Sequence, residues 1–398
     1  MSESTNINQN RKDNDTPKPV SIRPETTPLY TTSVYTFPTL DDVRNYYADS
    51  SSSYLYRRNG NPNTRQVEAI ISTLEGTEAS VLAASGMAAI AQGCFALLQP
   101  GDAVLATEVL YGGTYAFFEQ VLRPWGIDIT YVDVNNQRAL AKAMTSAVRM
   151  IYAETIANPL LQVTDLEGLG RFAQENRLYL VVDNTFATPA LTTPSVYGSA
   201  LVVHSLTKYL NGHSDVIGGV ASGSKTIVDR VRRFAETFGG VLSPYDAWMT
   251  ERGLQTFEIR VRKQFDNAYQ VATALCDHLV IEKVYYPGLD THETHGIAKR
   301  ILKNGFGAMV SFELRGGEAA ANAFVRACGS DILFAPSLGG VKTTISHPAL
   351  TSHRAFASEE RARLGITDGV IRLSVGIEPF EQIWHHVSQG LAAAAASQ

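Results

Sequence analysis

The feature that most restricts the fold of this chain is a regular alternation of short apolar runs with helical segments. Short runs rich in β-branched side chains predict buried strands. Such runs occupy residues 79–84, 103–106, 127–132, 148–153, 178–182, 201–203 and 216–221. Segments with helical spacing lie between several of them and end near residues 98, 122, 144 and 175. This order predicts an α/β layer with a mostly parallel sheet and helices on both faces.

The segments outside this region indicate two further units. Residues 1–20 are polar and lack periodicity, which is typical of a mobile tail. The stretch up to residue 60 is otherwise extended and aromatic, apart from a short helix expected at 41–48. We therefore predict an N-terminal extended segment (1–60), a large domain (61–250) and a C-terminal domain (251–398).

The C-terminal unit is expected to be a smaller α+β domain. A long helix is expected from 245 to 277, beside the point where the alternation of strands and helices lapses. The pattern beyond it predicts strands at 309–314 and 370–375 and helices at 318–328 and 380–395.

Charge and cysteine usage exclude several classes of protein. The 398 residues suffice for two domains with full cores, and a net charge of −5 argues against nucleic acid or an anionic membrane as a partner. No apolar run suits a membrane helix and no signal peptide opens the sequence, so a cytoplasmic protein is expected. Cys94, Cys276 and Cys328 have no metal-ligand spacing, and His292 and His295 are one residue too close for a zinc-protease helix. We expect reduced thiols and no metal site.

One lysine stands where packing alone would not place it. The apolar run at 201–203 leads into a polar turn that carries Lys208, with Ser205 and Thr207 at alternate positions beside it. Because burial of an unpaired ammonium is costly, such a site lowers the lysine pKa until the amine becomes a nucleophile. An amine beside two hydroxyl donors suits an aldehyde cofactor that carries a phosphate. Pyridoxal 5′-phosphate (PLP), bound as a Schiff base, is that cofactor.

Other chemically useful side chains also follow predicted strands. Tyr111, Asn158 and Asp183 come just after strand ends, where ligands bind in parallel sheets, so one pocket can hold them with Lys208. Asp183 either caps a turn or supplies the anion that PLP needs beside its pyridine nitrogen. Gly86, with Met87 next to it, either forms a plain turn or opens a helix whose N-terminus binds phosphate.

The residues around Lys208 resemble a known motif. Ser205-Leu206-Thr207-Lys208-Tyr209, followed by Gly212-His213-Ser214-Asp215 and Gly218-Gly219, is similar to the lysine motif of the Cys/Met-metabolism family of PLP enzymes. That family includes cystathionine γ-synthase, cystathionine γ-lyase, methionine γ-lyase and the O-acylhomoserine sulfhydrylases. The resemblance spans roughly residues 25 to 390. It implies PLP fold type I, which is aspartate-aminotransferase-like, with a mostly parallel sheet of the seven-stranded type and a smaller C-terminal α+β domain.

The resemblance also implies roles for these residues. Lys208 would hold PLP and move protons, Asp183 would face the pyridine nitrogen, and Tyr111 would stack on the ring and act as acid or base at the leaving group. Asn158 would contact the 3′ oxygen of the cofactor and the substrate. The phosphate contacts would be Gly86, Met87, Ser205 and Thr207.

Four further residues gain a role from the same resemblance. The segment around Tyr56 and Arg58 reads locally as a solvated loop, yet in relatives these side chains reach the PLP phosphate of a neighbouring subunit. We therefore expect a homotetramer, a dimer of dimers, with both side chains donated to the neighbouring site. Arg372 lies within an apolar strand pattern and needs an anion, either an internal carboxylate or that of the substrate. The family favours the substrate, with Ser337 in the substrate loop.

The exact reaction depends on less distinctive positions. Methionine γ-lyases typically carry cysteine where this chain has Gly113, and cystathionine enzymes typically carry glutamate where it has Lys342. A lysine there would repel the distal ammonium of cystathionine, and Arg57 adds another positive charge. We predict PLP-dependent γ-elimination on a γ-substituted L-amino acid such as methionine, homocysteine, an O-substituted homoserine or canavanine.

Other classes of protein remain as alternatives. A γ-replacement enzyme would form product only with a nucleophile, and a PLP aminotransferase would need a 2-oxo acid and release no ammonia. A nicotinamide dehydrogenase would need a glycine fingerprint that this chain lacks. A non-catalytic binding protein would have no use for a lysine at a strand end opposite an aspartate.

Overall fold

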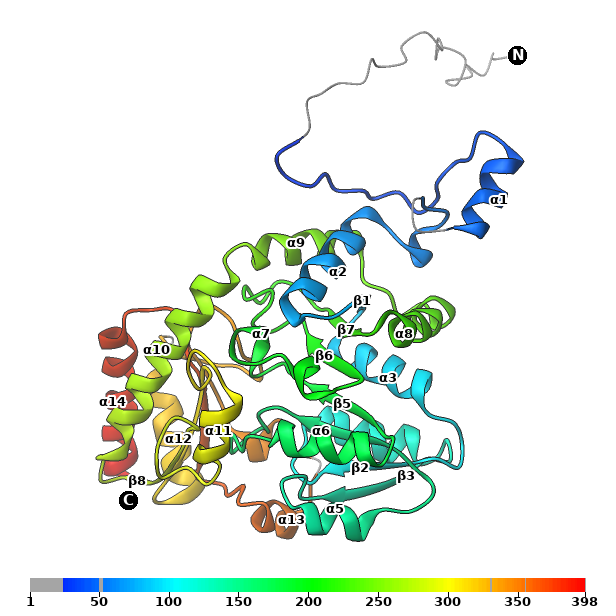
Figure 1. The fold of residues 1–398 in the computed structure, drawn as a ribbon. Helices are drawn as coiled ribbons and strands as arrows, with labels where there is room; N and C mark the ends of the chain where they lie inside the picture. The colour runs from blue at the N-terminus through cyan, green and yellow to red at the C-terminus, as the bar shows by residue number, and fades with distance from the viewer. Residues whose placement is uncertain (1–23, 50–52, 330, 355, 398) are drawn as a thin grey trace, which may run out of the picture.

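The computed structural model describes residues 24–49, 53–329, 331–354 and 356–397. Within these ranges the chain forms a seven-stranded sheet and, after it, a five-stranded sheet. Figure 1 shows helices in front of and behind the larger sheet, with the smaller sheet beside it against α10, α12 and α14. The tail predicted at 1–20 lies outside the described residues.

The large sheet has the order β1-β7-β6-β5-β4-β2-β3. Strand β7 runs antiparallel to both of its neighbours, and the other pairs are parallel. This arrangement confirms the predicted α/β class and the mostly parallel sheet. The strands are β1 (Ala79–Ala83), β2 (Ala103–Thr107), β3 (Asp128–Val132), β4 (Val148–Glu154), β5 (Tyr179–Asp183), β6 (Leu201–Ser205) and β7 (Gly219–Gly223).

Helices cover both faces of this sheet because its strands are apolar on both sides. Leu105 and Leu180 pack on one face against α6, whereas Val104 and Val181 pack on the other face with residues of α3 and α8. The helices of this half are α1 (Leu40–Ala48), α2 (Pro62–Glu75), α3 (Gly86–Leu97), α4 (Gly112–Phe117, continued by a π turn at Phe118–Leu122), α5 (Gln137–Ala143), α6 (Leu166–Glu175), α7 (Thr188–Leu191), α8 (Lys225–Phe238) and α9 (Pro244–Leu254).

The second sheet has the order β10-β11-β12-β9-β8 and belongs to the C-terminal part of the chain. Its strands are β8 (Ile281–Tyr285), β9 (Met309–Leu314), β10 (Leu333–Phe334), β11 (Thr344–Ser346) and β12 (Val370–Ser374). The accompanying helices are α10 (Phe257–Cys276), α11 (His295–Ile301), α12 (Gly317–Cys328), α13 (Ser358–Arg363) and α14 (Phe380–Ala396). The predicted smaller α+β unit is therefore present.

Two predicted elements have different boundaries. The single helix expected at 245–277 is divided into α9 and α10, because the N–H of Thr256 turns back to the carbonyl of Gly253. The strand expected at 216–221 begins only at Gly219, because the backbone of Gly218 bonds to Leu206 and Thr207 and closes the lysine turn instead. The domain division near residue 250 stays a prediction, and the break in the helix lies beside it.

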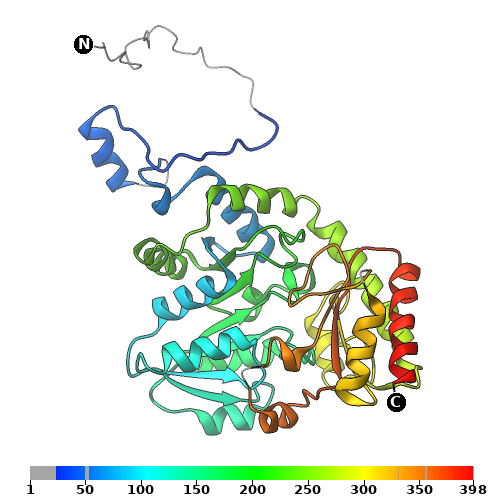
Figure 2. The ribbon, with the colours of Figure 1, turned by 180° about the vertical axis from the view of Figure 1, so that it is seen from behind.

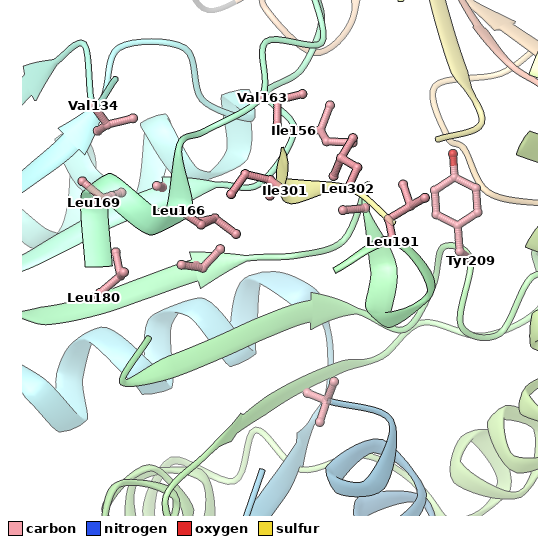
Figure 3. Packing of buried hydrophobic residues seen from close by; sticks show 14 of the residues in the cluster. Val134, Ile156, Val163, Leu166, Leu169, Leu180, Leu191, Tyr209, Ile301 and Leu302 are labelled. Carbon is pink, nitrogen blue, oxygen red and sulfur yellow. The ribbon is translucent and has the colours of Figure 1, made fainter. Parts of the chain in front are cut away.

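The turn that carries Lys208 is anchored in a buried cluster. Figure 3 shows ten labelled members of this cluster, including Leu180 from β5 and Leu302 after α11. Tyr209, which follows Lys208 directly, belongs to the same cluster and is almost fully buried. Burial of this ring fixes the backbone from which the lysine side chain extends.

The N-terminal part of the described chain is joined to α9 through Thr27, which bonds to Glu251 and Trp248. The stretch around α1 projects from the rest, as Figures 1 and 2 show from opposite sides. Its backbone near Val34 pairs with that near Tyr56, and several of its large apolar side chains are exposed. Within the described ranges, no helix has the length and apolar character needed to cross a bilayer. All three cysteines are free thiols, and only Cys276 is exposed.

Candidate functional site

A cavity of about 600 Å³ opens where several strands of the large sheet end. Strands β4, β5 and β6, the N-terminus of α3 and strand β12 of the smaller sheet all contribute to it. The structure brings together in its lining nine of the residues singled out from the sequence. They are Gly86, Met87, Tyr111, Asn158, Asp183, Ser205, Thr207, Lys208 and Arg372.

Lys208 lies in this lining, on the turn after β6. Its backbone N–H donates to the carbonyl of Ser205 over 3.2 Å, and its Nζ donates to Oγ of Ser337 over 3.0 Å. Burial lowers the pKa of Lys208 to about 8, and the positive charge of Arg372 acts in the same direction. An appreciable fraction of the amine is therefore neutral near physiological pH.

Two carboxyl groups line the cavity at the ends of adjacent strands. Asp183 ends β5 and Glu154 ends β4, and the two residues are partners in the sheet register. The N–H of Thr185 donates to Oδ1 of Asp183 over 2.9 Å. Burial raises the pKa of Asp183, while the hydrogen bonds from Thr185 and the nearby His204 oppose that rise.

Glu154 is a site residue that the sequence analysis missed. It is 5% exposed, and its carboxyl group accepts hydrogen bonds from the backbone N–H of Tyr111 at 2.7 Å and of Asn158 at 3.3 Å. Burial, and then the charge of Asp183, raises the pKa of Glu154 to about 8. One side chain thus holds the backbone of two predicted cofactor contacts. Its position at a strand end, in register with Asp183, was the available signal.

An anion cradle lies at the N-terminus of α3. Oγ of Ser85 caps the helix by accepting from the N–H of Ala88 at 3.1 Å, whereas helix geometry leaves the N–H groups of Gly86 and Met87 without intrahelical acceptors. A Cβ added at Gly86 would lie 2.8 Å from Cβ of Ser205, so only glycine permits this close approach. Free N–H groups beside a hydroxyl suit a phosphate.

Arg372 enters the cavity from β12 and is 4% exposed. Its guanidinium donates to Oδ1 of Asn158 and lies 6.0 Å from the centre of the Phe186 ring. Among the residues that the structure describes, no Asp or Glu forms an ion pair with it, and its Nε has no hydrogen-bond partner. The described residues therefore do not contain the internal acidic partner for Arg372 that was the alternative to a substrate carboxylate. Burial lowers the pKa of Arg372 to about 10, so it stays charged at neutral pH.

Gly113 leaves room for the ring of Tyr111. A Cβ at position 113 would lie 2.5 Å from Cε1 of Tyr111 and 3.2 Å from the sulfur of Met87. A larger residue there, including the cysteine expected of methionine γ-lyases, would move the tyrosine. The glycine is therefore linked to the observed ring position.

Five residues of interest lie outside the cavity lining. Ser337 lies between Pro336 and Leu338, which do line it, and its hydroxyl accepts from Lys208. Tyr56 is 43% exposed, and Arg58 donates to the carbonyl of Glu236 and lies 5.7 Å from the Tyr56 ring. Their contribution to a neighbouring subunit stays a prediction. Lys342 and Arg57 are exposed and do not line the cavity, so direct repulsion of a substrate by Lys342 has no support in this geometry.

The residues present fit pyridoxal phosphate. Lys208 supplies an amine of lowered pKa, Asp183 an acidic group for the ring nitrogen, and Gly86 with Ser205 a cradle for the phosphate. Among the described residues, no group of His, Cys, Asp and Glu side chains is arranged to hold a metal ion. Fold and cavity together define a PLP-dependent enzyme of fold type I.

Comparisons with known proteins identify the family. The family model described as Cys/Met metabolism PLP-dependent enzyme matches residues 5–392. The chain therefore belongs to the family of Cys/Met-metabolism PLP-dependent enzymes, and PLP is its cofactor.

Relatives of different activity are similar to nearly the same extent. The chain is 43% identical to an L-methionine gamma-lyase of Fusobacterium nucleatum subsp. polymorphum, over 92% of each chain. It is 38% identical to an O-succinylhomoserine sulfhydrylase of Pseudomonas aeruginosa, over 92% of this chain and 90% of the relative. The crystal structure of a cystathionine gamma synthase from Xanthomonas oryzae pv. oryzae, in complex with aminoacrylate and cysteine, matches with a TM-score of 0.89, 39% identity and 94% coverage of both chains. The chain is thus a transsulfuration-family enzyme, a lyase or a sulfhydrylase.

Proposed function

We propose that this protein catalyses γ-elimination on a γ-substituted L-amino acid. The observation that carries the proposal is the buried guanidinium of Arg372, which has no acidic partner among the described residues and faces the same cavity as the amine of Lys208. A guanidinium fork binds a carboxylate through two parallel hydrogen bonds, and the α-carboxylate of an amino acid would satisfy it. An amino acid held there would have its Cα near Lys208.

The proposed division of work follows from the position of each side chain. Bound PLP supplies an electron sink that stabilises negative charge at the carbon atoms of the substrate. Lys208 would take the proton from Cα and give it up again to the bound cofactor. Its amine, neutral once more, could then take a proton from Cβ. The carboxylate of Asp183 is the anion beside the ring nitrogen. Arg372 and Asn158 orient the α-carboxylate of the substrate. Tyr111 delivers a proton to the departing γ-substituent.

The charged side chains that line the cavity favour substrates without a distal ammonium group over substrates that carry one. In the part of the chain that the structure describes, Glu154 and Asp183 are the cavity's only acidic lining residues, and both lie at strand ends. Ile217, Leu338 and Leu350 give the cavity an apolar portion. Arg354 also lines it. A distal ammonium group would therefore meet no carboxylate beyond the strand ends, which argues against cystathionine. Methionine, homocysteine, an O-substituted homoserine and canavanine remain the proposed candidates.

A second candidate is γ-replacement, which the similarity to a sulfhydrylase and to a synthase favours. The test is an assay of 2-oxo acid and ammonia on a panel of γ-substituted amino acids, with and without a thiol. Product and ammonia without thiol support γ-elimination. Product only with thiol supports γ-replacement, and product only with a 2-oxo acid co-substrate supports an aminotransferase.

We also propose a homotetramer in which Tyr56 and Arg58 complete the site of a neighbouring subunit. The exposure of both residues, away from the cavity of their own chain, supports this. Mixed oligomers of Lys208→Ala and Arg58→Ala chains are then expected to recover roughly a quarter of wild-type activity, because half of the dimers contain one intact site. Oligomers of Lys208→Ala with Arg372→Leu, two changes within one site, are the control and should recover none. Equal recovery in both mixtures would contradict the shared site.

Attachment of the cofactor is expected to depend on pH in a defined way. Only the neutral amine attacks an aldehyde, and the pKa of Lys208 is lowered to about 8 from its ordinary value near 10.4. The rate at which cofactor-free protein gains visible absorbance with PLP should rise about tenfold per pH unit at low pH and level off near pH 8. Free Nα-acetyllysine, measured alongside, should accelerate to above pH 10. A protein profile that coincides with that of the free amine would refute the lowered pKa.

A further inference from the structure

Helix α10 carries three buried polar side chains on one face. Arg260, Gln264 and Asn267 are spaced four and three residues apart, so they lie above one another along the helix. All three are buried, and within the described ranges none forms an ion pair. Their donor groups are directed to backbone carbonyls of three segments: the turn that carries Lys208, the stretch around Gly340, and the stretch that follows strand β12.

Arg260 holds the lysine turn, which we define as residues 206–212. Its guanidinium donates to the carbonyl of Tyr209 at 2.9 Å and of Leu210 at 3.3 Å, and also to that of Gly253 at 2.9 Å. Gly212 has a φ of 78°, and a Cβ there would lie 1.8 Å from Nη1 of Arg260. The turn therefore ends in a glycine that leaves room for the arginine.

Gln264 and Asn267 hold the carboxylate segments, which we define as residues 337–341 and 375–378. Nε2 of Gln264 donates to the carbonyl of Gly340 at 2.8 Å and of Val375 at 3.2 Å. Nδ2 of Asn267 donates to the carbonyl of Gly376 at 3.0 Å and of Glu378 at 2.7 Å. The first segment contains Ser337, and the second continues from the strand that carries Arg372.

The lysine turn and the first carboxylate segment also touch directly. The N–H of Val341 donates to the carbonyl of Gly212 at 3.0 Å, and a Cβ at Gly339 would lie 2.6 Å from the backbone nitrogen of Tyr209. The hydrogen bond from Lys208 to Ser337 joins the same two segments. A shift of one segment against the other would change the distance between the lysine amine and the groups that bind substrate.

The amide side chains of Gln264 and Asn267 each have one oxygen without a hydrogen-bond partner among the described residues, which packing alone does not explain. These atoms, Oε1 of Gln264 and Oδ1 of Asn267, are both buried. Leaving such an atom unsatisfied costs stability, and an apolar residue of similar shape would avoid that cost. What an amide provides, and an apolar residue would not, is the two hydrogen bonds that each amide nitrogen donates to the carboxylate segments.

We propose that Arg260, Gln264 and Asn267 are positioning residues that set the separation between Lys208 and the carboxylate-binding Arg372. Arg260 fixes the lysine side of the site, and the two amides fix the arginine side. The inference rests on the proposed function, because it takes an amino-acid carboxylate to bind at Arg372. It predicts that replacing Arg260 changes the pH titration of the cofactor absorbance, whereas replacing Gln264 changes the Kd for an amino acid.

The test uses the holoenzyme and glycine, an amino acid without a γ-substituent, whose binding is followed through the visible absorbance of the cofactor. Gln264→Met should raise the Kd for glycine about tenfold and leave the pH titration of the cofactor absorbance unchanged. Arg260→Met should shift that titration, and Arg260→Lys should restore part of the shift. The matched control is Tyr286→Phe, which removes a buried hydrogen bond, 3.1 Å long, whose acceptor, the carbonyl of Gly307, lies outside the lysine turn and both carboxylate segments.

The outcomes separate the inference from the proposed function. A Gln264→Met enzyme that binds glycine as the wild type does, or a Tyr286→Phe control that weakens binding equally, would overturn the positioning role. If the wild type binds glycine but catalyses replacement or transamination, the proposed reaction fails while the binding test still decides the inference. If the wild type binds no amino acid, the role of Arg372 fails, and the inference that depends on it is overturned as well.

Discussion

Replacing Lys208 by alanine is expected to abolish turnover and the Schiff-base absorbance together. The side chain supplies the only cavity-lining lysine amine in the described part of the chain, and it is proposed both to hold the cofactor and to move the substrate protons. Loss of a positioned acid–base group alone costs about a hundred- to ten-thousandfold in rate, and loss of covalent attachment adds to this. Activity should therefore fall by at least about a thousandfold.

The measurement is the visible spectrum of the purified protein with added PLP, together with its rate of 2-oxo acid release. Lys225→Ala is a suitable control, because this lysine is exposed on α8, where it pairs with Asp229. The control should keep both the spectrum and the rate. A Lys208→Ala protein that turned over at a comparable rate would refute the mechanism.

Replacing Arg372 by leucine is expected to raise KM for the amino acid about a hundredfold while cofactor absorbance is retained. Truncation of one member of a buried charge pair costs roughly 2–5 kcal/mol of binding free energy, and here the lost partner is the substrate carboxylate. Arg372→Lys should give an intermediate KM, because an ammonium keeps the charge but not the two-pronged geometry.

Thermal unfolding separates this role from a structural one. Without substrate, Arg372 is a buried cation with no acidic partner among the described residues, so its presence costs folding free energy. The Arg372→Leu protein should then unfold at a temperature no lower than that of the wild type. An unchanged KM, or a KM that rises only because the protein is partly unfolded, would count against substrate binding by this residue.

The large sheet and the lysine turn could be predicted from sequence because their signals are local. Strands such as 148–153 and 201–203 are short, apolar and rich in β-branched residues, and the helices between them are amphipathic. The rule that ligands bind at the carboxyl ends of parallel strands then placed Asp183 and Lys208 in one cavity. The structure brings both into the same lining.

The features that escaped prediction depend on contacts between distant residues. Glu154 becomes notable only when the sheet register sets it beside Asp183 and its carboxyl group accepts from Tyr111. Gly253, near the end of α9, likewise meets a distant segment, because a Cβ there would lie 2.4 Å from the carbonyl oxygen of Asn211. Strand β10 has two residues and β11 has three, too few for a periodic pattern.

The most direct test of γ-elimination is a 2-oxo acid and ammonia assay without any added nucleophile. The panel holds methionine, homocysteine, cystathionine, O-acetyl- and O-succinylhomoserine, and canavanine. We expect 2-oxo acid and ammonia to appear together from at least one of them, and cystathionine to be a poor substrate. The best substrate then identifies the leaving group. Product that forms only when a thiol is supplied, without release of ammonia, would contradict γ-elimination and assign the enzyme to γ-replacement.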